Sequence, residues 1–196
     1  MSRAGNGRGK LVAATKELLW ERGYEQMSPR DVLDRSGTGQ GSLYHHFPTK
    51  LALAEAALKE MVAEEMAAMD AIFAPGKPPL LRLSDYLARK REALRGCRIG
   101  RLANETVMEA PELRGHVSAY LDHVERLIGQ AIAEGQAEKS LATDLDAQAL
   151  GAVFLSIIEG GFVLARAHWD PARMERALSG AEAVLKRLLV PSNRCS

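Results

Sequence analysis

The chain has little cysteine, few aromatic residues and no long hydrophobic run. Its two cysteines, Cys97 and Cys195, are too far apart to suggest a disulfide framework or a metal-binding spacing. Aromatic residues make up 5% of the chain, and β-branched runs are scarce, which argues against a β-sheet protein. No apolar stretch is long enough to span a bilayer, and Met1–Lys10 lacks the apolar core of a signal peptide. We therefore expect a soluble helical protein of a reducing cytoplasm.

Charge is almost balanced over the whole chain but is unevenly distributed along it. The formal net charge is +1, which argues against a protein that coats nucleic acid without selectivity. Residues 1–50 hold eight Lys/Arg and five Asp/Glu, a net charge of +3, whereas the remainder holds 18 basic and 20 acidic residues. A basic amino-terminal part on a neutral to acidic body is compatible with one nucleic-acid-binding face.

Hydrophobic periodicity and capping residues predict an all-α fold of about nine helices. The first helix begins at Lys10 and ends before Gly23, because apolar residues recur at helical spacing up to this glycine. Residues 1–9, which are polar, glycine-rich and basic, are predicted to form a flexible arm, and residues 191–196 a frayed tail. The other helices are expected within residues 28–36, 40–47, 49–73, 80–94, 97–109, 113–135, 143–164 and 170–188.

The segment from Ser28 to Lys50 is the most informative part of the sequence. Ser28-Pro29-Arg30-Asp31 is a strong helix start, with a hydroxyl at the N-cap, proline at N1 and an acid at N3. Gly37 follows two turns later and suits a turn that requires a positive φ. A second short helix then carries polar and aromatic residues up to Phe47. This pattern predicts a helix-turn-helix whose second helix enters the DNA major groove.

The same segment resembles the tetracycline-repressor-like (TetR/AcrR) family of bacterial transcription regulators over about residues 10–56. The agreeing positions include Gly23-Tyr24, Ser28-Pro29-Arg30-Asp31-Val32, Gly37, Gly41-Ser42-Leu43-Tyr44-His45-His46-Phe47 and Thr49-Lys50. Leu33, Gly39 and Leu51 depart from the family pattern and affect details of packing and phosphate contact. The resemblance implies a DNA-binding domain over residues 1–50 and a ligand-binding and dimerisation domain over residues 51–196.

The residues expected to contact DNA lie on both helices of the motif and just after it. Gln40 and Ser42 are placed for base edges, because recognition helices read mainly with their N-terminal end. The resemblance implies that Tyr44 and His45 contact the backbone and thymine methyl groups and that Lys50 anchors a phosphate. Two alternatives stay open here, namely that Ser28 serves only as a cap and that Tyr44 serves only as a packing residue. The predicted DNA-binding residues are Ser28, Arg30, Gln40, Ser42, Tyr44, His45 and Lys50.

The rest of the chain is expected to form a homodimer and to bind a small-molecule effector. The last two helices carry broad apolar stripes, which form the protomer interface in the resembled family or, alternatively, complete the monomer core. Gly96-Cys97-Arg98-Ile99-Gly100-Arg101-Leu102-Ala103-Asn104-Glu105 resembles a GC-x-x-G-x-L-x-x-E motif of one subgroup. Cys97 is either a small core residue, which we favour, or a reactive thiol. The pocket candidates are Tyr86, Cys97, Asn104, Met108, His116, Tyr120, Glu159, Phe162 and Trp169.

These observations predict a homodimeric transcription regulator, most often a repressor, that an effector releases from operator DNA. No nucleophile–base pair, metal ligand set or phosphate-binding loop supports an enzyme, and no cofactor is expected. The adjacent pair His45-His46 alone does not predict a metal site. A helical adaptor protein is the remaining alternative. The sequence does not identify the effector, the operator or the direction of regulation.

Overall fold

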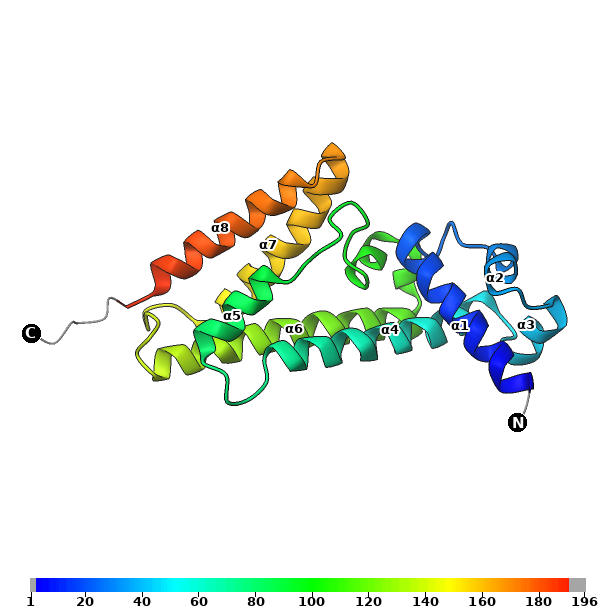
Figure 1. The fold of residues 1–196 in the computed structure, drawn as a ribbon, viewed down its shortest axis with the longest axis horizontal. Helices are drawn as coiled ribbons and strands as arrows, with labels where there is room; N and C mark the ends of the chain where they lie inside the picture. Colours follow the sequence, from blue (N-terminus) through cyan, green and yellow to red (C-terminus); the bar gives the residue numbers. More distant parts are fainter. Residues whose placement is uncertain (1–2, 191–196) are drawn as a thin grey trace, which may run out of the picture. The chain divides into compact units, whose positions relative to one another are not determined.

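The computed structural model describes residues 3–190, with side chains from Gly7 onward. The described residues form α-helices and two short 3-10 helices and contain no strand (Figure 1), which confirms the all-α prediction. The predicted frayed tail, with Cys195, lies outside the described residues. The elements are α1 (Arg3–Arg22), α2 (Pro29–Ser36), α3 (Gln40–His46), α4 (Lys50–Ile72), α5 (Pro79–Ala88), η1 (Gly100–Asn104), η2 (Thr106–Glu109), α6 (Pro111–Ala137), α7 (Ala147–His168) and α8 (Ala172–Leu188).

The chain divides into two compact units. The first unit contains Met1–Glu65 and Cys97–Tyr120, and the second contains Met66–Gly96 and Leu121–Ser196. The first unit therefore holds α1, α2, α3 and the start of α4, together with the segment that carries η1 and η2. The second unit holds α5, α7 and α8 with the C-terminal parts of α4 and α6.

Local capping determines where the short helices of the first unit begin and end. Ser28 caps α2 by accepting a hydrogen bond from the Asp31 N–H, and the Asp31 carboxylate accepts one from the Ser28 N–H. Gly37 ends α2 with φ +64°, a conformation that favours glycine. The Thr49 hydroxyl accepts from the Ala52 N–H at 3.0 Å and caps α4. All three sequence-based boundaries are confirmed.

The predicted irregular arm is wrong for residues 3–9, because α1 begins at Arg3. Two contacts account for the extra helical turns. A Cβ atom at Gly7 would lie 2.9 Å from the Ser42 Oγ, so α1 approaches α3 closely at this glycine. The Arg8 guanidinium lies over the Phe47 ring, 5.5 Å from its centroid. Local glycine content predicted disorder, whereas packing against α3 stabilises the helix.

The second unit contains a helical hairpin formed by α7 and α8 (Figure 1). Gly161 makes the close packing possible, because a Cβ atom there would lie 2.9 Å from the Met174 Sδ and 3.2 Å from the Ala177 Cβ. Gly151 has the same role against α6, where a Cβ atom would lie 2.7 Å from the carbonyl oxygen of Glu125. The stripes on α7 and α8 thus contribute in part to the core of the protomer.

Two other predicted helices are shorter or different in the structure. The helix expected over residues 80–94 ends at Ala88, where the Arg91 guanidinium donates hydrogen bonds to the carbonyls of Tyr86, Leu87 and Arg89. The helix expected over residues 97–109 is a turn followed by η1 and η2. A side chain satisfies the terminal carbonyls in the first case. In the second, the segment makes long-range contacts with α1, described below.

Candidate nucleic-acid interface

α3 presents a polar and aromatic face to solvent. Gln40, Gly41, Tyr44 and His45 are exposed, with 53% of Tyr44 accessible. They are spaced one, three and four residues apart, so they share one side of the helix. Leu43, 3% exposed, lies on the opposite side and packs in the core. The exposed face of α3, defined by these four exposed residues, is suited to entering a groove of DNA.

Ser42 and His46 differ from their neighbours because both are half-buried. The Ser42 hydroxyl faces Gly7 of α1, and the His46 Nε2 would lie 3.8 Å from a Cβ atom at the same glycine. The structure therefore groups Gln40 with Tyr44 and His45, and it places Ser42, the other residue predicted to read base edges, beside α1. A DNA contact by Ser42 stays a prediction.

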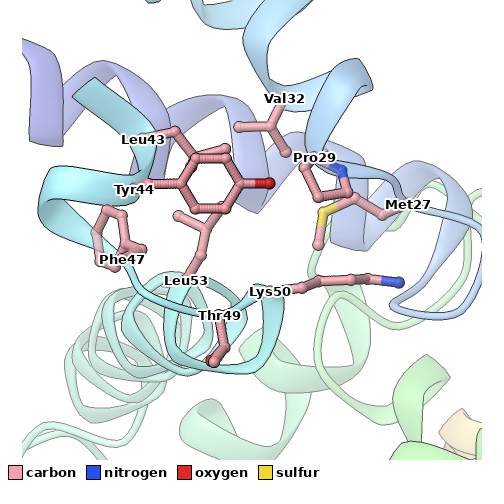
Figure 2. Close-up of a pocket in the computed structure, with 9 residues that line it drawn as sticks. All are labelled: Met27, Pro29, Val32, Leu43, Tyr44, Phe47, Thr49, Lys50 and Leu53. Carbon is pink, nitrogen blue, oxygen red and sulfur yellow. The ribbon is translucent and has the colours of Figure 1, made fainter. Parts of the chain in front are cut away.

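A small apolar pocket of about 10 Å³ beneath Tyr44 shows how α3 is held (Figure 2). The Tyr44 ring lies across the pocket while its hydroxyl group points toward α2 (Figure 2). Its volume is near the minimum for one water molecule, so the pocket is a packing feature and not an effector site. Its lining residues come from the turn before α2, from α2, α3 and the start of α4: Met27, Pro29, Val32, Leu43, Tyr44, Phe47, Thr49, Lys50 and Leu53.

The start of α2 combines a capping box whose side chains are both hydrogen-bonded with an exposed arginine. The Ser28 hydroxyl donates to the Asp31 carboxylate and accepts from the Asp31 N–H, so a phosphate contact by this hydroxyl requires it to leave the cap. The hydrogen bonds from Ser28, and then the Arg22 guanidinium at 3.0 Å, hold the pKa of Asp31 below its ordinary value. The Arg30 side chain is 90% exposed, 4.0 Å from Asp34. Arg30 is therefore accessible to a phosphate.

Lys50 begins α4 beside the helix-turn-helix, and its ammonium group packs on an aromatic ring. The Nζ atom lies over the Tyr24 ring, 4.2 Å from the ring centroid. Figure 2 shows the Lys50 side chain extending away from Tyr44. Burial lowers the pKa of Lys50, while attraction to Glu105 and Glu25 opposes this shift. The predicted phosphate anchor thus lies close to the motif and within the electrostatic influence of two acids.

Sequence reasoning missed how the segment 97–106 contacts the helix-turn-helix region. The Arg101 guanidinium donates to the carbonyl oxygen of Trp20, near the end of α1. Arg98 forms ion pairs with Glu64 at 3.1 Å and Glu65 at 3.2 Å on α4. These contacts join residues more than thirty positions apart, so no local spacing could indicate them. The signal available in the sequence was the density of arginines around Cys97.

The nine predicted pocket residues are divided between the two units. Cys97 and Tyr120 are buried in the first unit, and the Cys97 Sγ accepts a hydrogen bond from the Gly100 N–H at 3.2 Å. In the same unit Asn104 is exposed, whereas Met108 and His116 are half-buried. The burial of Cys97 supports its interpretation as a core residue.

The other four lie in the second unit and share no single environment. Tyr86 is buried, with its ring centroid 5.7 Å from that of Phe73. Glu159 and Phe162 are half-buried on α7, and Phe162 packs against a small cluster that includes Met174. Trp169 is 72% exposed and ends α7 with φ +51°. Their role in binding a ligand stays a prediction.

A cavity of about 410 Å³ lies within the second unit and involves none of these nine residues. Arg82, 6% exposed, forms an ion pair with Glu134 in its wall, and its Nε atom is buried without a hydrogen-bond partner. The volume falls in the range of small-molecule sites. The lining residues are Asp70, Phe73, Pro75, Gly76, Arg82, Arg126, Leu127, Gln130 and Glu134. No group of three or more His, Cys, Asp or Glu side chains with the geometry to hold a metal ion occurs among residues 3–190.

α7 exposes an apolar face opposite its buried side. Val153, Val163 and Leu164 are 45%, 59% and 48% exposed. Together with Gly160 they lie on one side of the helix. Contrary to the sequence-based expectation, one described helix, α7, is long and apolar enough to cross a membrane by length and composition alone, with 28% of its apolar window buried. The hairpin with α8 shows that the other side of α7 is packed in the protomer core.

Two family models match the chain in agreement with this geometry. The model for bacterial regulatory proteins of the tetR family matches residues 11–57, which include α1, α2 and α3 apart from the first turns of α1. The model for the tetracyclin repressor-like C-terminal domain matches residues 81–181. The second match alone spans more than half of the chain.

Individual relatives show the same likeness. The transcriptional regulator AcuR of Cereibacter sphaeroides is 27% identical over 168 residues, covering 82% of this chain and 77% of the relative. The HTH-type transcriptional repressor DhaR of a Mycobacterium species is 25% identical over 80% of both chains. The crystal structure of a regulatory protein TetR from Rhodobacter sphaeroides has a TM-score of 0.78 and 26% identity, covering 93% of this chain and 98% of that chain.

Proposed function

Because the chain belongs to the tetR family of bacterial regulatory proteins, we propose that it is a homodimeric repressor that a small-molecule effector releases from its operator. Like its relatives, it is a DNA-binding transcription regulator and not an enzyme. Repression is supported by the description of the relative DhaR as a repressor. We place its action in the cytoplasm, where such a regulator meets DNA.

The observation that carries this proposal is the exposed face of α3. Gln40 offers an amide that can form paired hydrogen bonds with adenine in the major groove. Tyr44 and His45 stand four and five residues later and are placed to contact the sugar–phosphate backbone or a thymine methyl group. Arg30 and Lys50 supply positive charge on either side for phosphates.

A dimer follows from the size of this interface and from the exposed apolar face of α7. One helix-turn-helix contacts too little DNA for tight and specific binding, so two half-sites are needed. Val153, Val163 and Leu164 supply an apolar surface that a second copy can cover. We therefore assign the protomer interface to α7 and α8.

Effector binding is assigned to the C-terminal part of the chain. The cavity that includes Arg82 has the volume of a small-molecule site. The nine predicted pocket residues remain candidates for lining an alternative effector site. In either case the effector lowers operator affinity only if it binds more tightly to the protein free of DNA than to the DNA-bound protein.

The proposal is tested with purified protein and duplex DNA from upstream of its own gene. We expect sequence-selective binding whose affinity falls steeply with salt concentration. A variant carrying Gln40→Ala and Tyr44→Ala should remain folded by circular dichroism but lose selectivity. Absence of salt-sensitive, selective binding by the wild-type protein would refute the proposed function.

A further inference from the structure

The segment 97–106 exchanges hydrogen bonds with the turn between α1 and α2. The Glu25 N–H donates to the Glu105 carboxylate at 2.8 Å. In return, the Thr106 N–H donates to the Glu25 carboxylate at 2.8 Å, and the Thr106 hydroxyl donates to the same oxygen. The hydrogen bonds from Thr106 lower the pKa of Glu25. Glu25 is therefore held as a charged acid beside Glu105.

Gly23 fixes the position of the Glu105 carboxylate further. The residue has φ +84°, and a Cβ atom there would collide with the Glu105 carboxylate. The carboxylate thus rests directly against the backbone of the turn, where any side chain at position 23 would displace it. Glycine at position 23 therefore allows the positive φ of the turn and leaves room for the Glu105 carboxylate.

Lys50 reaches the same turn through its contact with Tyr24. Tyr24, between Gly23 and Glu25, provides the ring on which the Lys50 ammonium group rests at 4.2 Å. Both carboxylates attract this ammonium group. A lysine that is to bind a phosphate must leave this seat or share it, because DNA phosphates and the acids compete for the same charge.

We propose that Glu105, which lies outside the helix-turn-helix, limits operator affinity by holding Lys50 on the Tyr24 ring together with Glu25. Glu105 is a positioning residue and acts on DNA through Lys50. The proposal rests on the proposed function, in which Lys50 contacts a phosphate. It assigns the segment 97–106 a role in setting how strongly the protein holds DNA.

The test is Glu105→Gln, which removes the charge and keeps an oxygen that can accept from the Glu25 N–H. We expect operator binding to tighten roughly two- to fivefold, the size of a partly exposed charge interaction. Glu109→Gln is the matched control, because Glu109 is exposed on η2 in the same segment. This control measures the effect of losing one negative charge from a residue that does not contact the turn. Glu25→Gln provides a second variant if Glu105→Gln does not fold.

Repeating both substitutions in a Lys50→Met background separates positioning from a structural role. Lys50→Met should reduce the slope of log affinity against log salt by about 0.9, the loss of one phosphate contact. In that background, Glu105→Gln should have no greater effect than Glu109→Gln. A gain that persists without Lys50, or no gain in the wild-type background, overturns the inference while the proposed function stands. Absence of selective DNA binding by the wild-type protein overturns both.

Discussion

The exposed face of α3 and the exposed apolar face of α7 differ in the partner that each surface suits. α3 leaves Gln40, Tyr44 and His45 accessible to solvent. α7 leaves the apolar side chains of Val163 and Leu164 accessible, and burying them would lower the free energy. The comparison indicates a polar partner for the first surface and an apolar partner for the second. DNA and a second copy of the chain fit these two requirements.

The two regions also differ in what stabilises them. α2 and α3 are short helices whose ends depend on Ser28, Gly37 and Thr49, residues within a few positions of the helices they serve. α7 depends on Gly151 and Gly161, which allow close approach to α6 and α8. Local changes should therefore damage the first region, and changes in volume should damage the second.

The largest expected effect comes from placing a charge in the exposed apolar face of α7. Val163→Lys would bury an unpaired ammonium group in the proposed dimer interface, at a cost of about 3–5 kcal/mol. We expect monomers at micromolar concentration and operator affinity weakened at least about 100-fold, a ratio that corresponds to about 2.7 kcal/mol. Light scattering and DNA binding measure the two outcomes.

Ala133→Lys is the control for Val163→Lys. Ala133 is exposed on α6 in the second unit, outside the two helices to which we assign the protomer interface. The added charge is the same, so any general effect on DNA binding is matched. A dimer that survives Val163→Lys unchanged would show that this face is not the protomer interface.

A smaller effect is expected from filling the contact between α6 and α7. Gly151→Ala places a Cβ atom 2.7 Å from the Glu125 carbonyl oxygen and should lower the free energy of unfolding by about 1–3 kcal/mol. Gly115→Ala is the control, because this exposed position in α6 has no atom within 4 Å of a new Cβ, and it should stabilise by up to about 1 kcal/mol. Denaturant unfolding that gives both substitutions the same sign would contradict the packing described.

Gln40→Ala should affect selectivity and leave stability unchanged. Loss of one amide-to-base contact costs about 1–3 kcal/mol for the preferred sequence and little for unrelated DNA. Competition binding with point-substituted operators measures the change, which should be confined to one base pair in each half-site. Equal weakening for all sequences would assign Gln40 to the DNA backbone and not to a base.

The smallest expected effect is the pH dependence of the α2 cap. The pKa of Asp31 is lowered in the folded protein from an ordinary value of 3.8, so its contribution is present above that value and is lost as pH falls toward the folded pKa. The difference in Tm between wild type and Asp31→Asn should therefore be greatest near neutral pH and shrink below about pH 4. A difference that stays constant with pH would mean that the Asp31 charge does not stabilise the cap.

The sequence predicted the features that depend on neighbouring residues. The capping box at Ser28, the glycine turn and the start of α4 after Thr49 are confirmed. The all-α class and the family assignment are confirmed as well. The capping box, the turn and the helix start each depend on a pattern shorter than about two helical turns, where local hydrogen bonding decides the conformation.

The failures have a common physical origin in long-range contacts. Residues 3–9 are helical because Gly7 and Arg8 pack against α3. The helix expected over residues 97–109 is replaced by η1 and η2, since Arg101 and Glu105 bind the end of α1 and the following turn. The cavity that includes Arg82 is lined by three separate segments, residues 70–76, α5 and α6. None of these pairings leaves a periodic signal in a single sequence.

Selection of bound sequences from random duplex DNA tests the central claim most directly. The wild-type protein should enrich a palindromic sequence of two half-sites whose centres are separated by about one helical turn of DNA or a multiple of it. The same selection with the Gln40→Ala and Tyr44→Ala variant should lose that enrichment. Enrichment of a single unpaired site, or no enrichment by the wild-type protein, would contradict a dimer that reads DNA with the exposed face of α3.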